Sequence, residues 1–338
     1  MKIGIIITPE RKREKIDQAC SEMGINYEYI NLLEDDWEIA IKQNYDGYII
    51  FPPAISEKWR RIFLKRLLIS RDILNGKTIP DLTSIMIYES KISMHDFYKY
   101  NNLPHIPSKT FFNYKEAKNF ASSCTLPVII KSDSGSGALS VKIIRNRFHL
   151  KTIITRAFFI NYKYLKFNSK FLIKKIKNFL YPYKIFKDSS NQFLPSIENN
   201  KGYIHIQEYI KIKYEWRIIR IGESYFGHKK LEDDGGFHSG SLNKGWGEVN
   251  KDLLDMVKEW TERHHFESIC LDIFEDKHGN YYINEIQVMF GTSTKEQLII
   301  DGAGGRYIYK NEWIFEKGNF AKNGCNNLRL NTLLQKIR

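Results

Sequence analysis

Apolar runs of strand length alternate with amphipathic segments over the first 85 residues, and this alternation constrains the fold more than any other feature. The apolar runs cover residues 2–8, 25–30 and 46–51, and helical patterns follow at about 10–20 and 56–74. Strands that alternate with helices run parallel, because each helix carries the chain back across the sheet. We therefore expect the chain to begin with a small three-layer α/β domain.

A different pattern begins after the proline-containing linker at 103–111. Residues 127–144 read as two apolar strands joined by a short loop, with Lys131 at the mouth and a tip formed by Ser134, Gly135, Ser136 and Gly137. Backbone N–H groups of small residues can converge on phosphate oxygens, and the lysine adds a positive charge. Many ordinary hairpins have similar tips, so the pattern alone leaves both interpretations open.

Two carboxylates stand among apolar residues near the carboxyl end. Asp272 lies in the segment 268–274 and Glu285 in the segment 281–288, with a glycine-containing turn between them. This predicts an antiparallel hairpin with the two residues side by side, and strand periodicity places Gln287 on the same face as Glu285. Carboxylate and amide oxygens suit Mg²⁺ that carries phosphates. The alternative is a solvated strand face with one salt bridge.

Glu208 and Glu215 lie seven residues apart around a short break between strands, and Arg217 follows on the same strand face as Glu215. Carboxylates in such positions can accept hydrogen bonds from an amine or from ribose hydroxyls. By itself this spacing is a weak indication of a site.

Taken together, the order of these features resembles the ATP-grasp superfamily. This group includes D-alanine–D-alanine ligases, glutathione synthetases and ligases that add glutamate to a ribosomal protein. The shared order is a lysine before a helix, a lysine before a Gly/Ser hairpin, two glutamates seven apart, and then Asp, Glu and an amide. The thirteen residues from Asp272 to Glu285, and two more to Gln287, fit the metal strands of the family. The resemblance covers about residues 85–300.

The resemblance implies roles for individual residues. Nucleotide phosphates would be bound by Lys91 and Lys131 beneath a mobile loop, Ser134–Gly137. Adenine would be read through backbone groups of Gln207, Glu208, Tyr209 and Ile210, and ribose would be bound by Glu215. The metal ligands would be Asp272, Glu285 and Gln287. Arg217 and Lys230 are the candidates for stabilising charge on the reacting acyl group, whereas Lys229 should point to the other strand face.

The resemblance also implies a fold and a division of the chain. A Rossmann-like pre-ATP-grasp domain (1–85) would precede a two-part ATP-grasp module with antiparallel sheets. Its parts would be a linker and first segment (86–126), a small nucleotide-binding lid (127–208) with a basic insertion (142–187), and a carboxyl-terminal subdomain (209–338) with the metal site.

The implied activity is an ATP-dependent ligation of a carboxylate to an amine, thiol or hydroxyl through an acyl phosphate. Its cofactors would be ATP and Mg²⁺, with Mn²⁺ as an alternative, and its substrate could belong to a cell-surface glycan or a peptide. A kinase of the same architecture and a non-catalytic nucleotide-binding protein are the alternatives. Two positions depart from the family: Gln287 stands where asparagine is usual, and Cys270 where some members carry arginine.

The net charge of +13 comes from one segment. Residues 142–187 contain thirteen Lys or Arg and no Asp or Glu, which leaves 39 basic and 39 acidic residues elsewhere. An excess confined to one segment makes nucleic acid an unlikely partner of the whole chain. Within it, residues 165–180 predict a basic amphipathic helix, either solvated, or in contact with an anionic membrane or lipid-linked substrate, or bound to a polyanion.

Other features of the sequence concern the location of the protein, a possible substrate loop and the oligomeric state. Four well-separated cysteines without a CxxC motif predict buried packing residues and a reducing cytoplasm, with the inner face of the membrane as a second location. The polar, glycine-rich stretch 233–247 predicts a loop, in which His238, Ser239 and Ser241 could contact substrate. A homodimer is left open.

Overall fold

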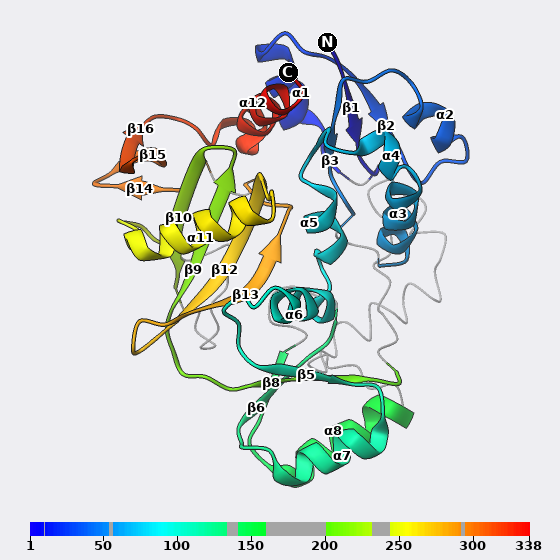
Figure 1. Ribbon diagram of the computed structural model, residues 1–338, viewed down its shortest axis with the longest axis vertical. Coiled ribbons are helices and arrows are strands. Elements are labelled where there is room, and N and C mark those ends of the chain that lie inside the picture. The colour runs from blue at the N-terminus through cyan, green and yellow to red at the C-terminus, as the bar shows by residue number, and fades with distance from the viewer. Residues whose placement is uncertain (10, 54–56, 134–140, 160–200, 232–243, 292–294) are drawn as a thin grey trace, which may run out of the picture.

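The computed structural model describes residues 1–9, 11–53, 57–133, 141–159, 201–231, 244–291 and 295–338. The predicted loop Ser134–Gly137, the predicted helix 165–180, and His238, Ser239 and Ser241 lie outside the described residues. The described chain forms three sheets with helices around them (Figure 1).

The first sheet is parallel, with the strand order β2-β1-β3-β4. Its strands are β1 (Lys2–Ile6), β2 (Asn26–Ile30), β3 (Gly47–Ile50) and β4 (Thr78–Ile79), and the connecting helices are α1 (Glu14–Glu22), α2 (Trp37–Ile41), α3 (Glu57–Ile69) and α4 (Arg71–Leu74). Alternate residues of β1 face opposite sides. Ile3 and Ile5 pack with Ile16 of α1, whereas Ile6 packs with Phe63 of α3. The predicted three-layer α/β arrangement is confirmed.

The carboxyl-terminal helix α12 (Asn326–Lys336) returns to this sheet, next to α1 (Figure 1). Leu330 and Leu333 are fully buried in the same cluster as Ile3 and Ile5. A Cβ at Gly47 would lie 3.0 Å from Leu333 Cδ1, so the glycine allows the helix to approach β3 closely. The sequence pattern did not predict this helix, and the proposed boundaries at 85, 126 and 208 stay predictions.

The second sheet is antiparallel and small, with the order β5-β8-β6-β7. Its strands are β5 (Ser108–Phe111), β6 (Val128–Lys131), β7 (Val141–Ile144) and β8 (Ile204–Glu208), and α7 (Tyr114–Ser123) and α8 (Arg147–Phe159) pack against it. The predicted hairpin of β6 and β7 is confirmed. In Figure 1, α6 (Lys91–Tyr100) is drawn between this sheet and β13, and α5 (Leu82–Ile87) precedes it.

The third sheet is large and antiparallel, with the order β13-β12-β9-β10-β15-β14, where β11 pairs with β10 and β16 with β15. Its strands are β9 (Ile212–Ile221), β10 (Ser224–Lys230), β11 (Lys244–Gly245), β12 (Ser268–Asp276), β13 (Tyr281–Gln287), β14 (Ile299–Ile300), β15 (Ala303–Lys310) and β16 (Glu312–Lys317). The predicted hairpin of β12 and β13 is confirmed.

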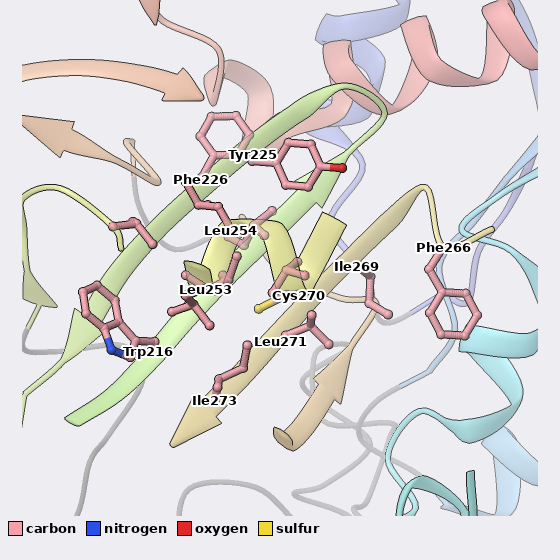
Figure 2. Packing of buried hydrophobic residues seen from close by; sticks show 14 of the residues in the cluster. Trp216, Tyr225, Phe226, Leu253, Leu254, Phe266, Ile269, Cys270, Leu271 and Ile273 are labelled. Carbon is pink, nitrogen blue, oxygen red and sulfur yellow. The ribbon is translucent and has the colours of Figure 1, made fainter. Parts of the chain in front are cut away.

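The core of this part lies where helix α11 (Lys251–Arg263) covers the large sheet. Figure 2 shows Leu253 and Leu254 of α11 against the strands that carry Trp216, Phe226 and Leu271. Packing of this area holds β9 and β12 side by side, and these strands carry Arg217 and Asp272, which are described below. All four cysteines are buried and free, as predicted, and Cys270 is part of this core.

Among the described residues, no helix is long and apolar enough to cross a membrane.

Candidate functional site

Asp272 lies at the centre of a buried charge cluster on the large sheet. It is opposite Arg217 on β9 and opposite Glu285 on β13. Arg217 donates two hydrogen bonds to its carboxylate, from Nε at 2.8 Å and from Nη2 at 2.9 Å. Lys230 of β10 donates a third at 3.1 Å and also pairs with Glu215, its partner across the strands. Positively and negatively charged side chains thus lie next to one another on the neighbouring strands β10, β9 and β12.

The electrostatics of this cluster favour the charged forms of Asp272 and Lys230. Burial alone would raise the pKa of Asp272, but the charges of Lys230 and Arg217 outweigh it and hold that pKa well below its usual range. Burial likewise disfavours the charged form of Lys230, yet Asp272 and Glu215 raise its pKa above the ordinary value. The side chains of Asp272 and Lys230 are only 1% and 7% exposed, so water screens these charges little.

The other two predicted metal ligands lie next to this cluster. Glu285 is directly across from Asp272, and its side chain is 22% exposed, with Lys91 Nζ at 3.9 Å from Oε1. Gln287 Oε1 accepts a long hydrogen bond of 3.5 Å from Arg217 Nη2. The structure therefore brings together Asp272, Glu285 and Gln287, as the strand pattern predicted.

Lys91 is placed by the capping of helix α6, of which it is the first residue. The preceding Ser90 accepts a hydrogen bond from Ser93 N, as an N-cap serine does. Asp133, two residues after β6, accepts from Ser90 Oγ at 2.7 Å and from Ile92 N at 2.9 Å. This carboxylate also suits the positive end of the helix dipole, and it ties the start of α6 to the end of the strand that carries Lys131.

Lys131 is 8% exposed and donates to Asn284 Oδ1 at 2.9 Å. Burial, and then the charge of Lys91, lower its pKa to about 8. Asn284 reaches it because the pairing of β12 and β13 shifts after Asp272: Glu285 pairs with Asp272 but Ile283 pairs with Ile273. A bulge of this kind redirects one side chain. Sequence reasoning missed Asn284, since strict alternation would turn it away from the side of Glu285.

Two further residues near Lys91 were also missed. Asp133 is visible in the sequence only as a residue after a strand. Glu89 has a positive φ of 61°, which is uncommon for a residue other than glycine. Burial, and then the charge of Glu285, raise the pKa of Glu89.

A small pocket opens beside Lys131, between α6, the small sheet and β13. Its lining includes three histidines, His95, His105 and His205, whose rings lie 5.2 to 5.6 Å apart around His95. Burial, and then the charge of Lys131, lower the pKa of His205 to about 3, so this imidazole is neutral at pH 7.

The predicted adenine-reading segment leads from this pocket to the large sheet. Gln207 lines the pocket and is 7% exposed, while Glu208 ends β8 on the solvent side and Tyr209 is 40% exposed. Ile210 completes the connection to β9, which begins at Ile212. The pocket, the two lysines and the carboxylates thus share one region where the two antiparallel sheets approach each other.

Comparison with solved structures decides the fold. The ATP-grasp protein with a RimK domain from Sphaerobacter thermophilus superimposes with a TM-score of 0.53 at 10% identity, over 86% of this chain and 92% of that one. This chain has the ATP-grasp fold. The ADP complex of N5-carboxyaminoimidazole synthetase from Staphylococcus aureus gives a TM-score of 0.55 at 13% identity, over 86% of this chain and 71% of that one.

Comparison of sequences gives less information about this chain than comparison of structures. No family model matches the chain. A stretch of 72 residues is 35% identical to the bifunctional purine biosynthetic protein ADE1 of Schizosaccharomyces pombe, which is 20% of this chain and 9% of that protein. The chain therefore shares the arrangement of its sheets with ATP-grasp proteins at low sequence identity.

The oxygen atoms of the candidate site are of the kind that bind a divalent ion. Two carboxylates and an amide supply hard oxygens of the kind that Mg²⁺ prefers. However, both oxygens of Asp272 already accept from cations, and the described residues contain no group of three His, Cys, Asp or Glu arranged to hold a metal alone. The donors fit an ion that arrives together with a polyanion, which would draw the cations away from Asp272.

Proposed function

We propose that the chain is an ATP-dependent ligase that joins a carboxylate to an amine through an acyl phosphate. The observation that carries this proposal is the pairing of Asp272 with Glu285 on adjacent strands, within reach of Lys91 and next to Arg217 and Lys230. The ATP-grasp fold, and the ADP bound by a structural neighbour, support ATP as the nucleotide.

Lys91 and Lys131 would bind the phosphates. Lys91, Lys131, Arg217 and Lys230 bring four cations into one region of low exposure. Cations in such a region attract the phosphates of a nucleotide, because the surrounding protein screens their charges less than water does. Residues 207–210 would read the base through backbone groups, and Glu215 would bind the ribose hydroxyls.

Asp272, Glu285 and Gln287 would hold Mg²⁺. Held there, the ion would supply positive charge that neutralises the phosphate groups of the nucleotide. Mn²⁺ prefers similar ligands and is the natural substitute.

The reaction would proceed in two steps. An oxygen of the substrate carboxylate attacks the γ-phosphorus of ATP, the bond to the β-phosphate oxygen breaks, and ADP leaves. The amine then attacks the acyl carbon, phosphate leaves, and the amine loses a proton. Arg217 and Lys230 would stabilise the charge on the acyl oxygens, and one such donor contributes about 3–4 kcal/mol.

The substrates are proposed only as classes. A carboxylate and an amine satisfy the chemistry, and a cell-surface glycan or a peptide would provide either group. Part of the basic segment 142–187 would serve a lipid-linked or membrane-bound substrate.

The direct test is to trap the intermediate. Purified protein is incubated with ATP, Mg²⁺ and a panel of amino acids and sugar acids without an added amine, and hydroxylamine is then supplied. A ligase yields a hydroxamate together with ADP. A kinase instead yields a phosphoester that hydroxylamine does not cleave, and a non-catalytic binding protein yields no ADP.

One variant in the site and one control variant test whether the reaction depends on Glu285. Glu285→Gln should abolish hydroxamate formation, because it removes one of the two carboxylates of the site. Glu316→Gln serves as the control, since Glu316 is a carboxylate on β16 that pairs with Arg306 away from the site. Equal loss in both variants would contradict the proposed role of Glu285.

A further inference from the structure

Arg60 lies in the first turn of α3, on the face of the helix that packs against the first sheet. Phe63 follows three residues later and is fully buried in the cluster that includes Ile6 of β1. Residues three apart share one face of a helix, so Arg60 is also directed inward, and only 7% of it is exposed. Because α3 carries the chain back between the parallel strands β3 and β4, its first turn lies at the edge of the sheet where β3 ends.

The guanidinium of Arg60 makes no hydrogen bond or ion pair with any residue that the structure describes. Its nitrogens nevertheless keep accessible surface, because none of them is among the fully buried polar atoms that lack a partner. Arg66 of the same helix shows the contrast, since it donates to the backbone oxygens of Leu32 and Glu34. A buried guanidinium without such acceptors is unfavourable unless water or a ligand supplies them. Arg60 therefore presents its N–H donors to a ligand.

The edge of the sheet beside Arg60 is the place where parallel α/β sheets bind ligands. From β1 the chain continues to β2 on one side, and from β3 to β4 on the other, while α1 and α3 pack on opposite faces. Ligands bind in the crevice that this divergence opens at the carboxyl ends of the strands. A second cation lies at the same edge, because the guanidinium carbon of Arg11, after β1, is 4.4 Å from the centre of the Phe51 ring, after β3. The two arginines and the positive end of α3 favour an anion there.

This edge of the first sheet adjoins the candidate site. Phe63, one turn along α3 from Arg60, shares its apolar cluster with Tyr88 and Val288. Tyr88 precedes Lys91 by three residues, and Val288 directly follows the last of the three proposed metal ligands. A molecule bound at Arg60 is therefore placed to extend towards the lysine and the carboxylates of the site.

Glu89 connects Arg60 electrostatically with those carboxylates. Burial, and then the charge of Glu285, raise the pKa of Glu89, whereas the charge of Arg60 lowers it. In the part of the chain that the structure describes, Glu89 does not form an ion pair with Arg60, so the donors of the arginine are left for a ligand.

We propose that Arg60 binds a second anionic group of the substrate, a carboxylate or a phosphate, at a distance from the carboxylate that ATP activates. The inference rests on the proposed function and narrows its substrates to molecules with two anionic groups. The planar guanidinium donates two parallel hydrogen bonds to the oxygens of such a group, and these bonds are stronger than those to a neutral amide or hydroxyl. Arg60 thus determines specificity without contact with the reacting atoms.

Protection from phenylglyoxal, which modifies guanidinium groups, tests the anion site without any turnover. In the full chain at constant ionic strength, malonate or inorganic phosphate should slow the modification of Arg60 by about tenfold at ten times its dissociation constant, because only the free arginine reacts. Malonamide, which is neutral, should not slow it. Arg61 is the internal control: it is exposed, and tandem mass spectrometry should find its rate unchanged by either anion. The anion that protects Arg60 more strongly identifies the group as a carboxylate or a phosphate.

The hydroxamate assay tests whether this anion belongs to the substrate. L-Glutamate and L-glutamine differ only in a carboxylate against an amide, and phosphoserine and serine only in the phosphate. For a pair that reacts, wild-type kcat/KM should be about 10- to 100-fold higher for the member with the additional charge. Arg60→Met should bring this ratio within about threefold, because the charged acceptor is no longer recognised, and Arg61→Met should keep the wild-type ratio.

The two assays separate failure of this inference from failure of the proposed function. Modification of Arg60 that neither anion slows, or no modification at all, overturns the inference, and this result needs no variant that has to fold. A substrate ratio that Arg60→Met leaves unchanged overturns it as well. In both cases hydroxamate formation leaves the ligase proposal standing. Protection of Arg60 without ADP or hydroxamate from any acid refutes the ligase proposal and leaves an anion site without that role.

Discussion

Replacing Asp272 by asparagine tests whether the buried charge cluster is held together as its geometry indicates. The substitution keeps the size of the side chain but removes the charge that faces Arg217 and Lys230. Breaking a buried ion pair by removing one partner costs about 3–5 kcal/mol. Lys230 still has Glu215, and Arg217 is 16% exposed, so we expect the lower end, about 3 kcal/mol.

Scanning calorimetry measures this effect. A loss of about 3 kcal/mol corresponds to a fall in Tm of roughly 4 °C, because an unfolding entropy of about 2.1 cal/mol/K per residue amounts to about 0.7 kcal/mol/K for a chain of 338 residues. Glu259→Gln is the matched control, because Glu259 pairs with Arg263 on the exposed face of α11, where both side chains are more than half exposed. Such a surface pair contributes about 0.5 kcal/mol or less.

The effect should also depend on pH with a definite sign. The pKa of Asp272 is lower in the folded than in the unfolded chain, so its contribution is present above the unfolded pKa of about 4 and declines as the pH falls below it. The difference between wild type and Asp272→Asn should thus be constant from pH 7 to about 4 and shrink at lower pH. A change in Tm no larger than that of Glu259→Gln, or a difference that grows in acid, would refute the reasoning.

Three further predictions follow from other parts of the site and the fold. Because burial lowers the pKa of Lys131 to about 8, ADP affinity should decline as the pH rises above 8, by up to about tenfold per unit, and Lys131→Arg should flatten that decline in titrations between pH 7 and 10. Since both oxygens of Asp272 are engaged by cations, electron paramagnetic resonance should detect bound Mn²⁺ only when ADP is present, and tight binding of Mn²⁺ alone would contradict this account. Leu333→Ala should lower the free energy of unfolding by about 2–5 kcal/mol, because Leu333 of α12 is fully buried against the first sheet, and it should leave the affinity for ADP unchanged.

Much of the fold could be predicted because the relevant signals are local. Alternating apolar runs predicted the parallel sheet, and the turn between residues 274 and 281 predicted the hairpin that places Asp272 beside Glu285. The helix over 251–263 was also predicted from its pattern, and it matches α11. The helix α12 and the hairpin of β15 and β16 were not predicted, because their stability depends on surfaces supplied by distant parts of the chain.

For the candidate site too, some residues could be predicted from the sequence and others could not. Periodicity was enough to put Asp272, Glu285 and Gln287 on neighbouring strands. It could not find Asn284, which reaches Lys131 only because the register of two strands shifts by one residue, nor Asp133, whose partners Ser90 and Ile92 lie more than forty residues earlier.

The amino-acid sequence by itself determined the order of strands and helices and the residue types that chemistry on phosphates requires, because backbone periodicity and side-chain identity belong to each segment alone. Only the tertiary structure decided which charged side chains contact one another. Arg217 and Lys230 neutralise Asp272 because β9 lies between β10 and β12 in the sheet, and Gln207 donates to Ser108 because the two residues face each other across the strands. Such contacts depend on burial and on register, and both arise only when the sheets are assembled.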